Sequence, residues 1–452
     1  IHIAGYNPII GGYGGAKFTN AGTLEVDSGQ AIIGDGVDLT NAGLVSVQSG
    51  LLDFVGAFAN SGAGTISISS GAEIVLEDGG SAKAGAITLA AGATLFVDGG
   101  SSGSTFSLGA GTIGGAGTVA LGSGELAVAA NATIGGFTQE DSTPSMVSGP
   151  GTLTVTGAVT SANTLLQTGP GATVLEGASA FTGGQLCLDG SRTLENQGTF
   201  SLTGSGSIFL GFNPFGSSPG GGSIKNDASA TLDIQGSNVI VASAGAAHFT
   251  NAGTLEKTGA GAAAIGVKVT DTGAVAAAGG TLDFTKAIGG DGTLAVDSGA
   301  ILEVGLSAAA SLAMTFSGGG GTLALGKAAK FAATINGFAA TDIIDLLNTS
   351  ATSATLGGGD RLVIVNGRKT IATLQLAGTY TGDTFNVAPD GNGGADITVT
   401  AGPAAAQPPA QGFIAAMAGL GAGAGGWARL MGDTRIAAFR PLLMAPRMAA
   451  FA

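Results

Sequence analysis

The chain contains 452 residues with a net charge of −14, and 85 of them are glycine while only 10% are charged. A mean hydropathy of +0.43 excludes a solvated disordered chain, and so much glycine excludes an ordinary globular core. The single cysteine excludes an intrachain disulfide and a cysteine-rich metal site, and the acidic balance argues against nucleic-acid binding.

Residues 1–17 precede the first repeat and are interpreted as an N-terminal cap or lead-in. From Phe18 onward one phrase recurs: an apolar residue, any residue, asparagine, any residue, glycine and then a short strand. Its copies include FTNAGTLEV from Phe18, LTNAGLVSV from Leu39, LENQGTFSL from Leu194 and FTNAGTLEK from Phe249. The asparagines at positions 20, 41 and 60 lie 19 to 21 residues apart.

A period of about 20 residues divided into three short strands matches one rung of a parallel β-helix, in which successive rungs pair at about 4.8 Å. We therefore predict that residues 18–335 form an all-β, right-handed parallel β-helix (β-solenoid) of about 20 residues per rung. Over the roughly 400 residues before the tail, this period gives about 20 rungs. Within a strand such as TLEV, Leu24 and Val26 should point inward while Thr23 and Glu25 face water.

The recurring asparagine has a structural role in this prediction. Stacked at the same turn of successive rungs, asparagine side chains hydrogen-bond one another, and the following glycine supplies the positive φ that the turn needs. We expect a structural turn ladder rather than a ligand-binding row. Its members are Asn20, Asn41, Asn60, Asn196, Asn226 and Asn251.

Two segments rich in Pro, Gly and Ser interrupt the repeat, TQEDSTPSMVSGPG from Thr138 and GFNPFGSSPGG from Gly211. Both are predicted to leave the rod as surface loops, where function specific to single rungs would be located. Phe209, Phe212 and Phe215, around Pro214, form a candidate aromatic contact patch for sugars or for a protein. The alternative is that these rings fold back onto the rod.

Residues 336–401 are predicted to continue the helix as less regular rungs. This passage contains Asn336-Gly337-Phe338 and DGNGGADIT from Asp390. Together with the FTNAGTLEV phrases, it resembles bacterial secreted β-helical repeat proteins, namely autotransporter passengers and filamentous haemagglutinin-type adhesins. The resemblance implies adhesion, biofilm matrix formation or self-assembly at the cell surface, and it implies no catalytic residues.

Carboxylates suggest two further kinds of site. Asp390, Asn392 and Asp396 approximate a calcium-binding nonapeptide, but such sites need consecutive copies and the chain has a single one, so no metal is expected. An acid pair, such as the carboxyl groups of Asp342 and Asp345, could serve as the catalytic acids of a glycoside-cleaving β-helix. Because the charges are few and scattered, we expect no enzymatic activity and no cofactor.

The end of the chain has a different composition. A Pro/Ala/Gln linker at 402–412 leads to an apolar tail at 413–452, whose four arginines and one aspartate give +3, against −17 for residues 1–402. The apolar run of the tail is too short for a membrane span. We interpret the tail as a docking element, with a flexible end as the alternative. The residues expected to make the contact are Trp427, Arg429, Leu430, Arg435 and Phe439.

These features favour an extracellular structural or adhesive β-solenoid at a bacterial cell surface: a surface adhesin, a biofilm-matrix component or a subunit of a self-assembling filament. Unpaired end rungs and the opposite charges of body and tail favour self-association. A surface polysaccharide or a host surface is the other candidate partner. The alternative from a different class is a carbohydrate-binding or carbohydrate-cleaving β-helix of the tailspike type.

Overall fold

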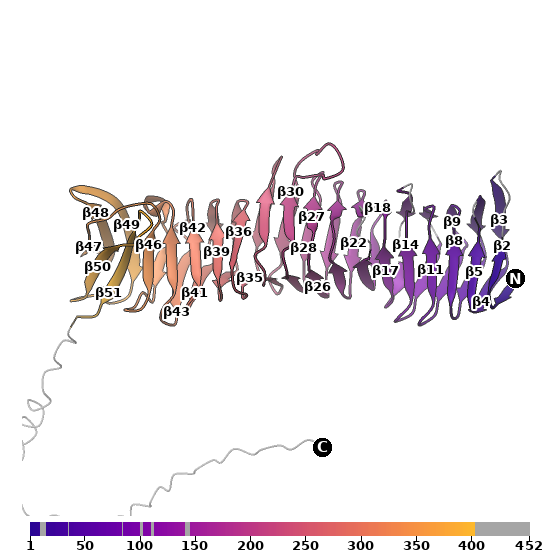
Figure 1. The fold of residues 1–452 in the computed structure, drawn as a ribbon, viewed down its shortest axis with the longest axis horizontal. Coiled ribbons are helices and arrows are strands. Elements are labelled where there is room, and N and C mark those ends of the chain that lie inside the picture. The colour runs from indigo at the N-terminus through magenta and orange to yellow at the C-terminus, as the bar shows by residue number, and fades with distance from the viewer. Residues whose placement is uncertain are drawn as a thin grey trace, which may run out of the picture. The chain divides into compact units, whose positions relative to one another are not determined.

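The computed structural model describes residues 1–9, 15–34, 36–83, 85–99, 103–109, 113–140 and 145–402. These residues form a stack of three-stranded rungs, about 15 turns long with about 21 residues between equivalent positions (Figure 1). Each rung pairs in parallel with the next, so the predicted parallel β-solenoid is confirmed. The described residues include a short 3-10 turn, η2 (Ala328–Lys330), and no helix long and apolar enough to cross a bilayer.

The rungs have three sides, which we call faces 1, 2 and 3 in the order in which the chain visits them. The strands of face 1 are β1 (His2–Ala4), β4 (Thr23–Ser28), β7 (Leu44–Val47), β10 (Thr65–Ile68), β13 (Ala86–Leu89), β16 (Ile113–Gly115), β19 (Ala132–Ile134), β22 (Thr152–Val155), β25 (Ala172–Leu175), β28 (Thr193–Asn196), β31 (Ser223–Asn226), β34 (His248–Asn251), β37 (Val269–Asp271) and β40 (Ile288–Gly290). The ladder of face 1 is interrupted between β16 and β19.

Faces 2 and 3 run along the whole stack. The strands of face 2 are β2 (Asn7–Ile9), β5 (Gln30–Ile33), β8 (Leu51–Phe54), β11 (Glu73–Leu76), β14 (Thr94–Val97), β17 (Thr118–Leu121), β20 (Gly136–Gln139), β23 (Val159–Ser161), β26 (Ala178–Phe181), β29 (Thr199–Leu202), β32 (Thr231–Ile234), β35 (Thr254–Lys257), β38 (Ala274–Ala277), β41 (Thr293–Asp297), β43 (Ala313–Ser317) and β45 (Thr334–Asn336). The strands of face 3 are β3 (Ala16–Asn20), β6 (Val37–Asn41), β9 (Phe58–Asn60), β12 (Gly80–Ala82), β15 (Thr105–Leu108), β18 (Gly124–Val128), β21 (Ser145–Ser148), β24 (Leu165–Gln167), β27 (Gln185–Leu188), β30 (Ser207–Leu210), β33 (Val239–Ala242), β36 (Ala262–Gly266), β39 (Thr281–Phe284), β42 (Ile301–Val304), β44 (Thr322–Leu325) and β46 (Ile343–Leu346).

Alternation along each strand places the hydrophobic core inside the stack. In β4, Leu24 and Val26 are fully buried whereas Thr23 is exposed, as the alternation predicts. Phe54 of β8 and Phe58 of β9 meet inside one rung, with ring centroids 5.1 Å apart. Columns of inward Val, Ile, Leu and Phe side chains continue from rung to rung as one core. Each Å² of apolar surface that this core removes from water stabilises the stack by roughly 25 cal/mol.

The C-terminal part of the stack corrects the prediction of less regular rungs over 336–401. After β46 the chain forms an antiparallel meander of β47 (Ser353–Gly357), β48 (Arg361–Asn366) and β49 (Lys369–Ala377), then an antiparallel hairpin of β50 (Thr384–Pro389) and β51 (Ala395–Thr400). β49 pairs with β45 and β51 pairs with β46, so these strands cover edges that the last rung would leave open. Because they form no rungs, the stack has about 15 turns in place of the expected 20 or so.

The two predicted surface loops have different outcomes. In the first segment, Gln139 ends β20 and Ser145 begins β21, both with buried side chains, while residues 141–144 lie outside the described residues. The Gln139 amide is satisfied there because it donates to the carbonyl of Thr164 over 2.8 Å and accepts from the hydroxyl of Ser161. The second segment does leave the stack, as a loop over residues 211–222 between β30 and β31 (Figure 1).

Candidate functional site

Asn20, Asn41 and Asn60 occupy the same turn of three consecutive rungs, at the ends of β3, β6 and β9. The Asn20 amide donates to Asn41 Oδ1 and the Asn41 amide donates to Asn60 Oδ1, both over 2.8 Å. The same amides also donate to backbone carbonyls of the strands that follow, those of Leu44 and Thr65. All three asparagines are at most 6% exposed, so this ladder joins rungs and presents little to a ligand.

Asn196, Asn226 and Asn251 form a second ladder at a different corner, since they end strands of face 1 whereas the first ladder ends strands of face 3. Asn196 donates to Asn226 over 2.8 Å, Asn226 to Asn251 over 2.7 Å, and Asn251 to Asp271 Oδ1 over 2.7 Å. Burial raises the pKa of Asp271, and the hydrogen bond from Asn251 opposes that rise. The series ends at Asp271 because its partner in the next rung is Gly290, which has no side chain. The six predicted asparagines therefore make two ladders.

The glycine of the repeated phrase has a different role from the predicted one. Gly43 and Gly253 do not adopt positive φ. A Cβ on Gly43 would lie 2.0 Å from the carbonyl oxygen of Gly22 in the rung before, and one on Gly253 would lie 2.2 Å from that of Asp227. Glycine is required at these turns because the stacked backbones approach too closely for a side chain.

The loop at residues 211–222 is fixed by its own polar groups and by the rod. Asn213 Oδ1 accepts a hydrogen bond from the N–H of Phe215 over 2.8 Å, which closes an Asx turn. On the return path, the N–H of Gly220 donates to Oδ1 of Asp189 over 2.9 Å, and Asp189 is fully buried in the corner before β28. The loop therefore has a defined position above face 3.

This loop and the outside of face 3 enclose a groove of about 580 Å³. Thr164, Gln185 and Ser207 contribute from equivalent positions of three successive rungs, and Phe209 and Phe215 contribute aromatic surface. The ring of Phe215 is 45% exposed. The residues that line the groove are all uncharged: Thr164, Gly184, Gln185, Ser205, Ser207, Phe209, Pro214 and Phe215. An aromatic surface beside hydroxyl and amide groups suits a neutral ligand with many hydroxyls.

Of the three predicted aromatic residues, two line this groove and the third supports it. Phe212 packs against Phe209 with ring centroids 5.5 Å apart, at an interplanar angle of 49°. Phe209 is thereby held at the base of the loop, while Phe215 presents its ring to solvent. The patch is partly folded back onto the rod and partly available for contact.

Carboxyl groups form a column outside face 3 near the C-terminal end. Asp283 of β39 is paired with Glu303 of β42, and Asp345 of β46 lies opposite Asp396 of β51. Burial raises the pKa of all four groups. For Asp345, burial and then the neighbouring carboxylates of Asp396 and Asp390 raise the pKa to about 6. Like charges that face each other in this way oppose the pairing at neutral pH.

Asp390 of the calcium candidate and Asp342 of the acid pair have structural roles in the turns that contain them. Asp390 Oδ1 accepts from the N–H groups of Asn392 and Gly394, over 2.6 and 2.9 Å, and so closes the connection between β50 and β51. Asp342 is fully buried and accepts three hydrogen bonds from backbone N–H groups. Within the described ranges, no three Asp, Glu, His or Cys side chains are grouped so that they hold a metal ion.

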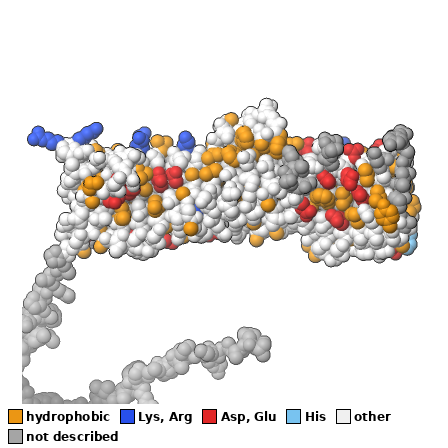
Figure 2. Space-filling view, in the orientation of Figure 1, with side chains coloured by type: hydrophobic (Ala, Val, Ile, Leu, Met, Phe, Trp, Pro, Cys, Tyr) orange, Lys and Arg blue, Asp and Glu red, His pale blue; other side chains and the backbone are white. Residues whose placement is uncertain are grey.

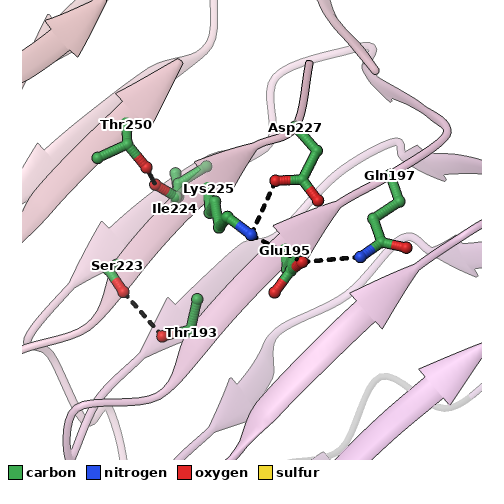
Figure 3. Close-up of polar contacts among 8 residues, drawn as sticks. All are labelled: Thr193, Glu195, Gln197, Ser223, Ile224, Lys225, Asp227 and Thr250. Carbon is green, nitrogen blue, oxygen red and sulfur yellow. Dashed lines mark hydrogen bonds and ion pairs between the residues drawn. The ribbon is translucent and has the colours of Figure 1, made fainter. Parts of the chain in front are cut away.

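Lys225 shows how a cation of the stack is neutralised (Figure 3). Its Nζ lies 2.9 Å from Oε1 of Glu195 and 2.9 Å from Oδ1 of Asp227, on the outside of face 1. The hydrogen bonds to Asp227 and then to Glu195 raise the pKa of Lys225. The neighbouring hydroxyls of Thr193 and Ser223 are 2.9 Å apart. The polar groups in this view are engaged with one another, so this part of face 1 is a structural surface.

The groove residues that the sequence prediction missed include Thr164, Gln185 and Ser207, which lie at equivalent positions of successive rungs. They are separated by 21 and 22 residues, which is one rung each, and Ser207 is two residues from Phe209. The sequence signal that identifies them is the repeat period, because counting back from Ser207 in steps of one rung leads to the other two positions. The predicted tail residues Trp427, Arg429, Leu430, Arg435 and Phe439 lie outside the described residues.

Comparison of the chain with protein-family models, with curated proteins and with solved structures returned no match.

Proposed function

We propose that the protein is an extracellular β-solenoid that acts as a structural and adhesive surface, like the autotransporter passengers and filamentous haemagglutinin-type adhesins that its repeats resemble. The observation that carries the proposal is the loop at 211–222, which adds an uncharged groove to an otherwise regular stack of rungs. A solenoid offers a long surface, and contacts specific to one place on it arise where an insertion interrupts the rungs.

The groove supports a surface polysaccharide as the ligand. The exposed ring of Phe215 offers a face on which the C–H groups of a sugar stack. Gln185 and Ser207, one rung apart, supply an amide and a hydroxyl to hydrogen-bond sugar hydroxyls. Because no lining residue is charged, a neutral polymer is favoured over a uronic-acid polymer.

Replacing Phe215 by serine is expected to weaken binding to a neutral glycan about tenfold, because an aromatic contact contributes about 1 kcal/mol or more beyond its buried area. The measurement is biolayer interferometry of the full chain against immobilised neutral glucan, mannan and galactan, with alginate as the acidic comparison. Leu306→Ser is the matched control, since Leu306 is an exposed apolar residue elsewhere on the stack, at 37% exposure. Equal binding by wild type and Phe215→Ser, or binding to alginate alone, would contradict the groove as the contact site.

A carbohydrate-cleaving tailspike-type protein is the second candidate, since it would use the same groove. Glycoside hydrolysis requires two carboxyl groups that flank the bond, and none of the eight residues that line the groove is a carboxylate. We therefore propose binding without cleavage. Assay of the bound glycan for new reducing ends distinguishes the two functions, and their release would favour the cleaving candidate.

A further inference from the structure

Lysines that are far apart in the sequence gather at the corner between face 3 and face 1 in the C-terminal half. Backbone hydrogen bonds between successive rungs define equivalent positions at this corner. The N–H groups of Phe249 and Val269 donate to the carbonyls of Lys268 and Ala287, and the N–H groups of Ile288 and Ala308 donate to the carbonyls of Ser307 and Lys330. Lys286 directly precedes Ala287, and Lys327 begins the turn that ends at Lys330. We call Lys268, Lys286, Lys327 and Lys330 the basic corner.

The basic corner is open to solvent. All four side chains are exposed, and Figure 2 shows cations along one edge of the C-terminal half of the stack. In the part of the chain that the structure describes, ion pairs involve His2 and Lys225 and none of these four lysines. The row covers three rung steps, or roughly 14 Å.

An acidic row of the same length lies at another corner in the N-terminal half. Leu76, Val97, Leu121 and Gln139 are paired in register along face 2, so the residues that follow them stand above one another at the corner with face 3. We call three of these followers, Glu77, Asp98 and Glu140, the acidic corner; Gly122 is the fourth. Burial and then the charges of Asp53 and Asp98 raise the pKa of Glu77, as expected where carboxylates crowd.

We propose that the acidic corner of one molecule binds the basic corner of a second copy, so that the rods associate side by side with a stagger. The two rows have opposite charge, equal length and the same rung spacing, so their charges match position for position. They belong to different halves and different corners of a rod, so they meet between molecules. A contact between two different patches is heterologous and does not close, which leads to an open filament.

This inference rests on the proposed scaffold function and gives it a mechanism of self-association. The choice of a second copy over a free polyanion follows from the acidic corner, which supplies on the same molecule a partner for the basic corner. Attraction between exposed charges is screened by salt, so the association should weaken strongly at about 1 M NaCl, where the Debye length is about 3 Å.

Charge reversal in the full chain tests the proposal. Lys286→Glu with Lys327→Glu reduces the net charge of the basic corner from +4 to zero, and Glu77→Lys with Glu140→Lys changes that of the acidic corner from −3 to +1. Each variant keeps its other corner unaltered, so the two variants can still pair with each other. Sedimentation velocity at low salt should show assembly of the wild type, at least tenfold weaker assembly of either variant alone, and recovered assembly in an equimolar mixture of the two. Lys17→Glu with Lys83→Glu is the matched control, because these exposed lysines carry the same charge change outside the basic corner.

Failure to recover assembly in the mixture, or unchanged assembly of the single variants, would overturn the proposal. A wild type that stays monomeric while binding alginate through Lys286 and Lys327 would also overturn it, in favour of a polyanion as the partner. The charge variants leave Phe215 and the groove unaltered, so their binding to neutral glycans reports the proposed adhesive function separately. Circular dichroism confirms that each variant retains its strands.

Discussion

Replacing Asn226 by alanine is expected to destabilise the stack by about 3 kcal/mol, since each buried polar group left without a partner costs about 1 to 3 kcal/mol. Asn226 is fully buried in the middle of the second ladder. It accepts from Asn196 over 2.8 Å and donates to Asn251 over 2.7 Å and to the carbonyl of Thr254 over 2.9 Å. Alanine removes these bonds and leaves the buried polar groups of Asn196, Asn251 and Thr254 without them. The measurement is the midpoint of thermal and denaturant unfolding.

The matched control for this substitution is Asn392→Ala, because the Asn392 side chain is exposed in the turn between β50 and β51. Its midpoint should agree with that of the wild type. If Asn226→Ala unfolds at the same midpoint as the control, the ladder does not stabilise the rungs and the structural role assigned to the asparagines is wrong.

Replacing Asp345 by asparagine is expected to stabilise the C-terminal end of the stack at pH 7.5 by about 1 kcal/mol and to have little effect at pH 4. The pKa of Asp345 is raised from 3.8 to about 6, so the folded chain binds a proton more tightly than the unfolded chain. Stability is therefore lost as pH rises from about 4 through 6, and the full loss is present above that range. A pKa shift of this size corresponds to roughly 3 kcal/mol of unfolding free energy. The expected stabilisation is smaller, because the Asp345 side chain is partly exposed to solvent that screens its charge.

Unfolding midpoints between pH 4 and pH 8 check this expectation, and the wild type should be more stable near pH 5 than at pH 7.5. Burial also raises the pKa of Glu303 and Asp396, with contributions from neighbouring carboxylates, so both act in the same direction. Asp38→Asn is the control, since it removes one charge from an exposed position on β6. A wild type whose stability rises steadily from pH 5 to pH 8 would contradict the assignment.

The rung and its inward residues could be predicted because both depend on local patterns. Alternation identifies Leu24 and Val26 as core residues, and the Asn-x-Gly phrase identifies a turn of the stack. The same phrase cannot indicate which of three corners it occupies, because a turn between two short strands has the same chemistry at each corner. This is why Asn60 and Asn196, which occupy the same position of the repeated phrase, belong to different ladders.

Other features depend on how rungs stack and lie beyond any local pattern. The steric need for Gly43 arises from a carbonyl in the preceding rung, 21 residues earlier. Lys268, Lys286 and Lys327, separated by 18 and 41 residues, look scattered until the rungs align them. The hairpin between β48 and β49 did have a local signal, the pair Asn366-Gly367, where Gly367 adopts a φ of 60°.

Electron microscopy of the purified chain at low salt decides whether this solenoid is a self-associating surface scaffold. Thin rods are expected to join with a stagger into filaments at low salt and to separate into single rods at about 1 M NaCl. Discrete closed trimers at both salt concentrations would contradict this expectation and would favour the tailspike-type alternative.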